Sequence, residues 1–354
     1  MVRVTEKDAK QYAASLLRAV GCPAAEARLV ADVMITANLR GVDSHGILRL
    51  PIYLKRLRLN VPKVGKLINP KPKMKVTQKK GATAVFNGDR GMGQLAGTRA
   101  MGLCIELARK HGIAAVGVVN SNHFGTCAQF TCQAAAKGCV GLCTTHGESD
   151  VVPFGGTTPV LGTNPIGFAA PMGKYPFPLS VDMATSIVAF GKVFQAQAKG
   201  EPIPDDWAFD HDGKPTTDPN KVRGIRGMAG PKGTALSLMI DVLSGVLTGG
   251  HFGLKVRRMY HNFEQAQEVA HLMLAIDIAH FIPLRSFKRR IDELGDMIKA
   301  SPPEPPNKEV FLPGQIEHIK TLQRRAEGFD LPEDLVRQLN EHAAELGVKS
   351  PWTA

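Results

Sequence analysis

The chain has 354 residues, of which 44% are hydrophobic and 21% are charged. This is the composition of a globular protein with room for one large core or two domains, and no apolar run is long enough to cross a membrane. The N-terminus lacks a hydrophobic signal segment, so we expect a cytoplasmic protein that does not bind membranes.

The net charge of +12 comes largely from one segment, because residues 55–80 hold ten Lys or Arg residues and no acid. A basic run of this kind can bind nucleic acid. This one has almost no interleaved aromatic residues and is interrupted by Pro62, Pro70 and Pro72. We therefore interpret it as a solvated connector and expect no nucleic-acid partner.

The six cysteines form no Cys-x-x-Cys pair, and several fall inside apolar stretches. We interpret them as small core residues of a protein in a reducing compartment. A zinc site built from His123, Cys127 and His146 would have a spacing that matches no common zinc pattern, so we predict no metal site.

Residues 1–60 are expected to be mostly helical. Thr5 precedes an apolar stripe that includes Tyr12 and Leu16, which predicts a capped amphipathic helix ending near Gly21. Pro23 can open a second helix that runs to about residue 37.

The segment of residues 43–53 brings together a hydroxyl, an imidazole, a guanidinium and a phenol: Ser44, His45, Arg49 and Tyr53. If the segment is helical, His45, Arg49 and Tyr53 lie along one face, although Pro51 would kink the last turn. An arginine can bind a carboxylate through two hydrogen bonds, and a histidine can move a proton near neutral pH. The segment therefore suits a small carboxylate substrate; the alternative is a helix cap followed by a partly buried surface helix.

From about residue 82 the pattern alternates between strands and helices, which is typical of a mixed α/β domain. We expect strands at residues 82–86, 113–119, 140–145, 179–182 and 269–276, and helices at 98–110, 125–137, 185–198, 234–247, 284–299, 315–327 and 332–346. Residues 151–172 are predicted to form loops around short strands, and residues 200–232 a long surface excursion. Residues 301–307 are predicted to form an extended hinge. Because both ends of the chain are helical, we predict a helical domain of residues 1–75 with 277–354, beside an α/β domain of residues 76–276.

A glycine-rich turn at Gly91, Gly93 and Gly97 lies between a predicted strand and a predicted helix. Its spacing differs from the Rossmann pattern, and the next strand ends without the acid that would bind a ribose. We therefore reject a Rossmann site. Lys232 lies at a predicted helix start, where its charge and the backbone amides could hold a phosphate, although this signal is weak alone.

Two strand ends carry polar groups that can face a cleft. The first is Asn120–Gly125, which contains His123 and can equally be a capping loop. The second ends on Asp182, which either caps a helix or pairs with an imidazole and fixes its tautomer.

Several motifs in the same order resemble those of the malate/L-lactate dehydrogenase family of the second type, which is unrelated to the Rossmann-fold enzymes and includes ureidoglycolate, sulfolactate and diketogulonate oxidoreductases. The motifs are Asp43–Arg49 with Tyr53, Asn120–Gly125, Pro153–Gly156, Leu161–Ile166, Asp182–Ser186, Lys232-Gly233, Leu243–Gly249 and Pro313-Gly314. The resemblance covers nearly the whole chain. It implies a non-Rossmann, mixed-sheet nicotinamide-binding fold and a homodimer whose partner subunit helps to build the site.

The resemblance also implies roles for individual residues. Ser44, His45 and Asp182 would form a catalytic relay, and His123 would be a second acid/base candidate. The residues that would bind the substrate are Arg49, Tyr53 and Thr157. Those that would line the cofactor are Ser121, Asn122, Met183, Ala184, Lys232 and Gly314. The chain departs from the family pattern at His146-Gly147, at Gln315 and at Pro231, which puts some cofactor contacts in question.

The predicted function is therefore an NAD- or NADP-dependent oxidoreductase that moves a hydride between nicotinamide and a malate- or lactate-like 2-oxo or 2-hydroxy acid. We favour His45 as the proton carrier, with His123 as the alternative. The alternative function is a catalytically inactive, nicotinamide- or ligand-binding homologue of the same fold.

Overall fold

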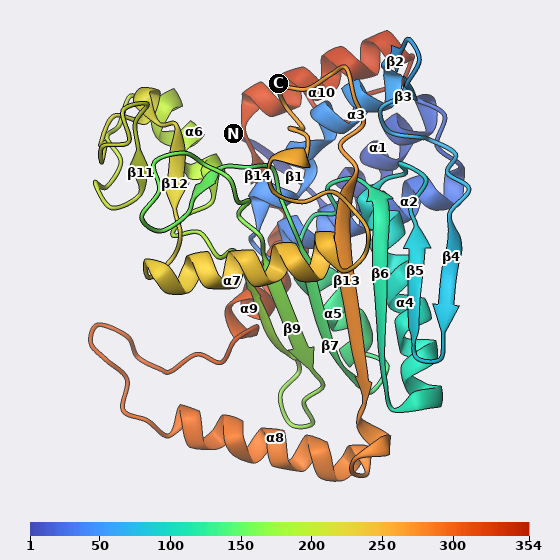
Figure 1. Ribbon diagram of the computed structural model, residues 1–354, viewed down its shortest axis with the longest axis vertical. Coiled ribbons are helices and arrows are strands. Elements are labelled where there is room, and N and C mark those ends of the chain that lie inside the picture. Colours follow the sequence, from blue (N-terminus) through green and yellow to red (C-terminus); the bar gives the residue numbers. More distant parts are fainter. Residues whose placement is uncertain (354) are drawn as a thin grey trace.

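A seven-stranded mixed β-sheet forms the centre of the molecule (Figure 1). The computed structural model describes residues 1–353. The strand order is β10-β9-β7-β13-β6-β5-β4; β5 and β6 run parallel, and the other neighbouring pairs are antiparallel. The strands are β4 (Lys75–Lys80), β5 (Thr83–Asn87), β6 (Ile113–Ser121), β7 (Cys139–Thr145), β9 (Ile166–Ala170), β10 (Leu179–Met183) and β13 (Val269–Asp277). Since a Rossmann sheet is mostly parallel, this sheet is of another kind, and the predicted mixed α/β fold is confirmed.

Helices cover both faces of the sheet. In Figure 1, α7 (Pro231–Asp241) crosses in front of the strands, while α4 (Gly93–His111) and α5 (Cys127–Ala135) lie behind them. α4 begins earlier than predicted, because Gly93 and Gly97 are helical. A Cβ on Gly93 would lie 2.1 Å from the carbonyl oxygen of Asn122. Gly93 and Gly97 therefore allow close packing of α4.

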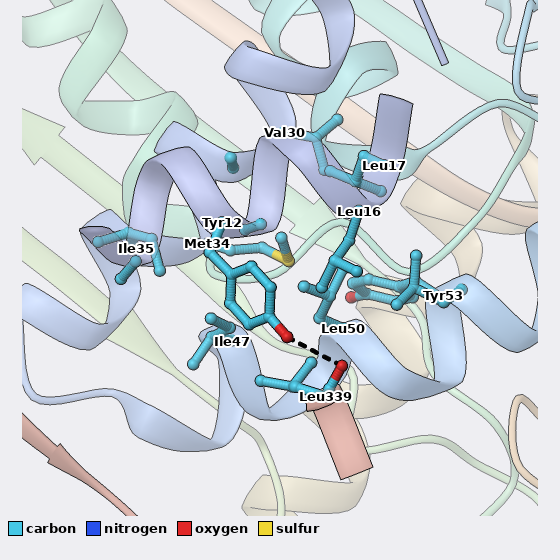
Figure 2. Close-up of a cluster of buried hydrophobic side chains, with 14 of the residues drawn as sticks. Tyr12, Leu16, Leu17, Val30, Met34, Ile35, Ile47, Leu50, Tyr53 and Leu339 are labelled. Atoms are coloured by element: carbon cyan, nitrogen blue, oxygen red, sulfur yellow. Dashed lines mark hydrogen bonds between the residues drawn. The ribbon is translucent and has the colours of Figure 1, made fainter. Parts of the chain in front are cut away.

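The helices near the two chain ends share one hydrophobic core. They are α1 (Glu6–Ala19), α2 (Ala24–Leu39), α3 (Leu50–Arg58) and α10 (Glu333–Leu346), and next to them β1 (Val2–Val4) pairs with β14 (Phe329–Leu331). The predicted Thr5 cap is present, since its hydroxyl accepts a hydrogen bond from the amide of Asp8. Figure 2 shows the buried side chains, with the Tyr12 hydroxyl donating to the Leu339 carbonyl oxygen at 3.0 Å.

The segment after β13 differs from the predicted domain boundary. Helix α8 (Leu284–Lys299) lies at the far end of the sheet, away from the terminal helices (Figure 1). It is attached to the loop after β9, because Asp292 accepts hydrogen bonds from the amides of Gly173 and Lys174. The chain returns to the helical core only through α9 (Gln315–Glu327), which contacts α2.

The predicted surface excursion, residues 200–232, is part of a folded lobe with its own small core. The lobe also includes α6 (Phe190–Lys199), and its three-stranded sheet consists of β8 (Val151–Val152), β11 (Ala208–Phe209) and β12 (Gly224–Arg226). Helix α6 begins later than the predicted residue 185: the Thr185 hydroxyl donates to the carbonyl oxygen of Thr163 in another loop, and the Ser186 hydroxyl donates to the carbonyl oxygen of Val188.

The basic connector contains more regular structure than predicted. After α3 it forms the hairpin of β2 (Asn60–Val61) and β3 (Gly65–Lys66), and it ends in β4, an edge strand of the main sheet whose residues are all exposed. Lysines on an exposed edge disfavour pairing with another chain. No helix within residues 1–353 is long and apolar enough to cross a membrane.

Candidate active site

The Asp43–Tyr53 segment is not one helix. A 3-10 turn at Asp43–His45 and a second at Ile47–Arg49 flank Gly46, and α3 starts only at Leu50. The reason lies in α2, whose Asn38 side chain donates to Asp43 and accepts from the amide of Ile47. A Cβ at Gly46 would lie 2.1 Å from this side chain.

The predicted kink at Pro51 is also wrong. Pro51 lies in the first turn of α3, where the missing N–H costs nothing because that group has no partner within a helix. His45 and Arg49 therefore lie in turns that precede the helix, and only Tyr53 projects from α3.

Four predicted site residues nevertheless converge: His45, Arg49, Tyr53 and His123. The His45 ring stacks on the His123 ring with centroids 5.4 Å apart. His45 Nδ1 is hydrogen-bonded to Ser44 Oγ at 2.9 Å, and Arg49 Nε donates to the Ser44 carbonyl oxygen at 2.7 Å. The Tyr53 hydroxyl is hydrogen-bonded to His123 Nδ1 at 2.6 Å. The motif after β6 and the motif after α2 thus form one cluster.

Three residues that the sequence did not single out hold this cluster. Gln94 Nε2 donates to the Tyr53 hydroxyl at 3.2 Å, and the amide of His123 donates to Gln267 Oε1 at 3.1 Å. Arg49 Nη1 donates to the Tyr260 hydroxyl at 2.6 Å.

The loop that carries Tyr260 and Gln267 is tied to α3 by Arg56, a fully buried side chain. Its guanidinium donates to the carbonyl oxygens of Met259, Asn262 and Gln265. In the sequence, the one indication of this contact is that Arg56 falls among the apolar positions of α3. Because Arg56 also belongs to the basic run of residues 55–80, it does not stand out.

The electrostatic environment keeps both imidazoles neutral. Burial, followed by the nearby Arg49 charge, lowers the pKa of His45 to about 3. Burial, followed by the charges of His45, Arg49 and His271, holds the pKa of His123 well below its usual range. Both residues are half-buried. At neutral pH either ring can therefore accept a proton.

Ser121 and Asn122 lie behind this cluster and are almost completely buried. Ser121 Oγ is hydrogen-bonded to His271 Nε2 at 2.9 Å, so its hydroxyl is engaged within the protein. The Asn122 amide group donates to the carbonyl oxygens of Arg90 and Gly91, while its Oδ1 has no partner within residues 1–353. The cofactor contacts of Ser121 and Asn122 stay predictions, and Asn122 Oδ1 is the side-chain acceptor of this pair that has no partner within residues 1–353.

Asp182 does not pair with His45. Its Oδ2 accepts a hydrogen bond from the amide of Ala128 at 2.8 Å, at the start of α5. Helix α5 packs against β9 and β10, so its first turn presents free amides and the positive end of its dipole to this carboxylate. The predicted relay of Ser44, His45 and Asp182 is therefore not formed, and Asp182 caps a helix other than the one that follows it.

The predicted cofactor residues after β10 lie beside the start of α7. Met183 is 40% exposed. A Cβ on Gly233 would lie 2.8 Å from the carbonyl oxygen of Thr185, so the turn after Ala184 touches the first turn of α7. Lys232 is exposed and forms no ion pair within residues 1–353. Pro231, a departure from the family pattern, occupies the first helical position, which suits proline.

Gly314 and Thr157 lie further out. Gly314 has a φ of +94°, and a Cβ there would lie 2.7 Å from the carbonyl oxygen of Pro178, next to β10. Thr157 is exposed and packs beside Gly213 in the small lobe, outside the histidine cluster. Within one chain, Thr157 is thus not brought to Arg49.

The other two departures have structural roles. His146 is buried, and its Nε2 accepts from the amide of Ala270, while its Nδ1 has no partner within the described part of the chain. Gln315 Oε1 accepts from the amide of Leu312 and from Lys299 Nζ at the start of α9. Residues 1–353 contain no group of three His, Cys, Asp or Glu side chains arranged to hold a metal ion.

A sequence model of the malate/L-lactate dehydrogenases matches residues 4–340. The chain belongs to this family. It is 40% identical to the L-sulfolactate dehydrogenase of Methanocaldococcus jannaschii over 341 residues, which cover 96% of each chain. It is also 35% identical to the ureidoglycolate dehydrogenase (NAD(+)) of Escherichia coli over 338 residues, or 96% of this chain and 95% of that protein.

Solved structures agree with the family assignment. The malate dehydrogenase of Entamoeba histolytica superposes with a TM-score of 0.92 at 29% identity, over 99% of both chains. The relatives include a ureidoglycolate dehydrogenase named for NAD(+) and a (2R)-3-sulfolactate dehydrogenase named for NADP(+). The predicted family is confirmed, and the predicted nicotinamide-dependent dehydrogenase activity on 2-hydroxy acids is confirmed at the level of the family.

Proposed function

We propose that the protein is an NAD(P)-dependent dehydrogenase that interconverts a 2-hydroxy acid and its 2-oxo acid, with a second acidic group on the substrate, as in malate and sulfolactate. The observation that carries this proposal is the cluster of Arg49 and His123, in which a fixed cation lies beside an oriented, neutral imidazole. Relatives named for malate and for sulfolactate support the substrate class.

Arg49 would bind the substrate carboxylate. Its Nε and Nη1 are held by Ser44 and Tyr260, while its Nη2 has no hydrogen-bond partner within residues 1–353. A guanidinium fixed in this way is pre-organised for a carboxylate. Bound carboxylate would also offset the Arg49 charge that lowers the pKa of His45 and His123, which would favour protonation during reduction of the oxo acid.

His123 would carry the proton. Its Nδ1 is held by Tyr53, which orients the ring and leaves Nε2 for the substrate oxygen. The sequence favours His45 because Ser44, Arg49 and an expected Asp182 partner surround it, but Asp182 accepts from the Ala128 amide instead. His45 would then support His123 through ring stacking.

The residues present fit a dinucleotide beside this cluster. Lys232 provides an exposed positive charge at the start of an eleven-residue helix, which suits a phosphate. Asn122 Oδ1, buried and without a partner among residues 1–353, would accept a hydrogen bond from an amide. Met183 and Ala184 would contact the ring system. When bound, the nicotinamide supplies or accepts the hydride.

The second acidic group would be recognised by the loop that carries Tyr260. A cavity of about 690 Å³ opens on this loop, and the basic residues that line it are His251, Lys255, Arg257, Arg258 and His261.

A screen at 340 nm of 2-oxo acids with one or two acidic groups, with NADH and NADPH, tests the proposed function. Turnover of the substrates with two acidic groups supports the proposed function. Cofactor binding without turnover of any oxo acid would instead indicate a catalytically inactive homologue.

We also propose a homodimer. The outer surface of α7 and of the turn that follows it exposes a run of apolar side chains: Leu238, Met239, Val242, Val246 and Leu247. Contiguous apolar patches on a soluble chain are typical of subunit interfaces. Sedimentation analysis tests this, since Leu247→Glu should shift the dimer toward monomer; a wild-type chain that sediments as a monomer would contradict it.

A further inference from the structure

Gln94 is a buried carboxamide in the first turn of α4, at the back of the histidine cluster. Its side chain is 0% exposed. Its Nε2 lies 3.2 Å from the Tyr53 hydroxyl, which lies 2.6 Å from His123 Nδ1. Its carbonyl oxygen, Oε1, has no hydrogen-bond partner within residues 1–353. His123, Tyr53 and Gln94 thus form a hydrogen-bonded chain of side chains that ends at the unpartnered Oε1 of Gln94.

The direction of hydrogen bonding along this chain is fixed by the number of hydrogens. A tyrosine hydroxyl has one hydrogen, and an amide NH₂ only donates. With the NH₂ of Gln94 facing Tyr53, the Tyr53 hydrogen has to be donated to His123 Nδ1. A neutral His123 then carries its own hydrogen on Nε2.

Protonation of His123 reverses this requirement. Both ring nitrogens of an imidazolium are donors, so Nδ1–H has to donate to the Tyr53 oxygen. The Tyr53 hydrogen then needs another acceptor, because a buried hydroxyl without one is costly. The unpartnered Oε1 of Gln94 reaches Tyr53 after a half-turn of the carboxamide and provides that acceptor.

We propose that Gln94 is a positioning residue that sets, through Tyr53, which nitrogen of His123 carries the proton. Within residues 1–353, Gln94 is hydrogen-bonded to neither His123 nor Arg49, and the hydrogen bonds that link it to His123 pass through the Tyr53 hydroxyl. The inference rests on the proposed role of His123 for its catalytic meaning, whereas the proton arrangement itself can be measured without substrate or cofactor.

One charged and two titratable groups face His123 as well. They are His45 stacked on its ring, Arg49 from the turn before α3, and His271 from β13. These groups change how readily the whole ring is protonated. The position of the hydrogen on a neutral ring depends instead on the partner of each nitrogen, which makes the tautomer the more specific readout.

The test is nitrogen-15 NMR of histidine-labelled full-length protein at pH 7, with the His123 signals identified by their loss in His123→Gln. In the wild type we expect a hydrogen on Nε2 and none on Nδ1. Gln94→Glu places a group that only accepts when ionised next to Tyr53, so the hydrogen should move to Nδ1. Adding Tyr53→Phe to Gln94→Glu should abolish this move, which separates the hydrogen-bonded chain from a simple effect of charge.

Gln94→Met, which neither donates nor accepts, tests the catalytic consequence. The protonated His123 loses its support, so oxo acid reduction should slow about tenfold and its pH optimum should move to lower pH. Gln133→Met is the matched control, because Gln133 is a partly buried carboxamide that contacts α4 at Thr98 and does not touch Tyr53. It should leave both the tautomer and the pH profile unchanged.

The outcomes distinguish the role of Gln94 in the proton arrangement from the role of His123 as the proton carrier. An unchanged His123 tautomer in a folded Gln94→Glu protein overturns the inference, as does an unchanged pH profile in Gln94→Met. A tautomer that moves as expected, combined with normal turnover of His123→Gln, would leave the role of Gln94 intact and refute His123 as the proton carrier.

Discussion

Replacing Arg56 tests whether the loop that carries Tyr260 and Gln267 is an integral part of the active site. Arg56 is 0% exposed, and its guanidinium donates to three backbone carbonyl oxygens of that loop at 2.7–3.1 Å. Arg56→Met keeps most of the apolar stem and removes all three contacts. The loop should then loosen, and Tyr260 should release Arg49.

The expected size of the effect follows from these contacts. A hydrogen bond to a charged group contributes about 1.5–3 kcal/mol, and Arg56 forms three of them. Since the freed carbonyls can turn toward solvent, we expect the lower figure for each bond and about 3–5 kcal/mol in total. Loss of the Tyr260–Arg49 hydrogen bond, at about 1.4 kcal/mol, corresponds to roughly a tenfold rise in KM.

Urea unfolding and steady-state kinetics with the preferred oxo acid measure the two effects. Arg58→Met is the matched control, because Arg58 lies on the same helix in an exposed ion pair with Glu345, a type of contact that contributes about 0–1 kcal/mol. If Arg56→Met unfolds like Arg58→Met and keeps the wild-type KM, the loop is not held by Arg56 and this account of the site is wrong.

Three further substitutions address single residues. Arg49→Lys should raise KM for the oxo acid about tenfold or more, with cofactor affinity nearly unchanged in a fluorescence titration, because lysine cannot form the two-pronged carboxylate contact; a collapse of cofactor affinity would show that Arg49 has another role. Lys232→Ala should weaken cofactor binding by about 1.5–3 kcal/mol, the contribution of one charge-assisted contact, and an unchanged titration would leave the phosphate site elsewhere. Asp182→Asn keeps an acceptor for the Ala128 amide, so turnover should fall less than about tenfold, with a loss of stability of about 0.3–1 kcal/mol from the helix dipole; a loss of about 10⁴-fold in turnover would restore the relay with His45.

Local patterns predicted most elements of the fold. The Thr5 cap and the stripe of Tyr12 and Leu16 are sufficient to place α1, because a helix of this kind is specified by residues within a few turns of one another. The strands that became β6 and β13 were likewise visible as short apolar runs bounded by turns. Element starts were less certain where glycine was involved, as at α4, since Gly93 can end a turn or begin a tightly packed helix.

The site was harder to predict because its contacts join distant residues. Asp182 and Ala128 are 54 residues apart, and only the packing of α5 against β9 and β10 shows that this carboxylate faces a helix start. Gln94, Tyr260 and Gln267 carry no periodic signal, and each is recognised only by the side chain that it contacts. Likewise, the sequence shows Gly46 and Asn38 but not their close contact, which leaves no room for a side chain at position 46.

The most direct test of the central claim is single-turnover reduction of an active 2-oxo acid by His123→Gln and His45→Gln, followed at 340 nm beside a cofactor titration. If His123 carries the proton, His123→Gln should lose about 10²–10⁴-fold in the hydride-transfer rate while binding the cofactor normally, and His45→Gln should lose less. A His123→Gln rate within a few-fold of the wild type would contradict the account.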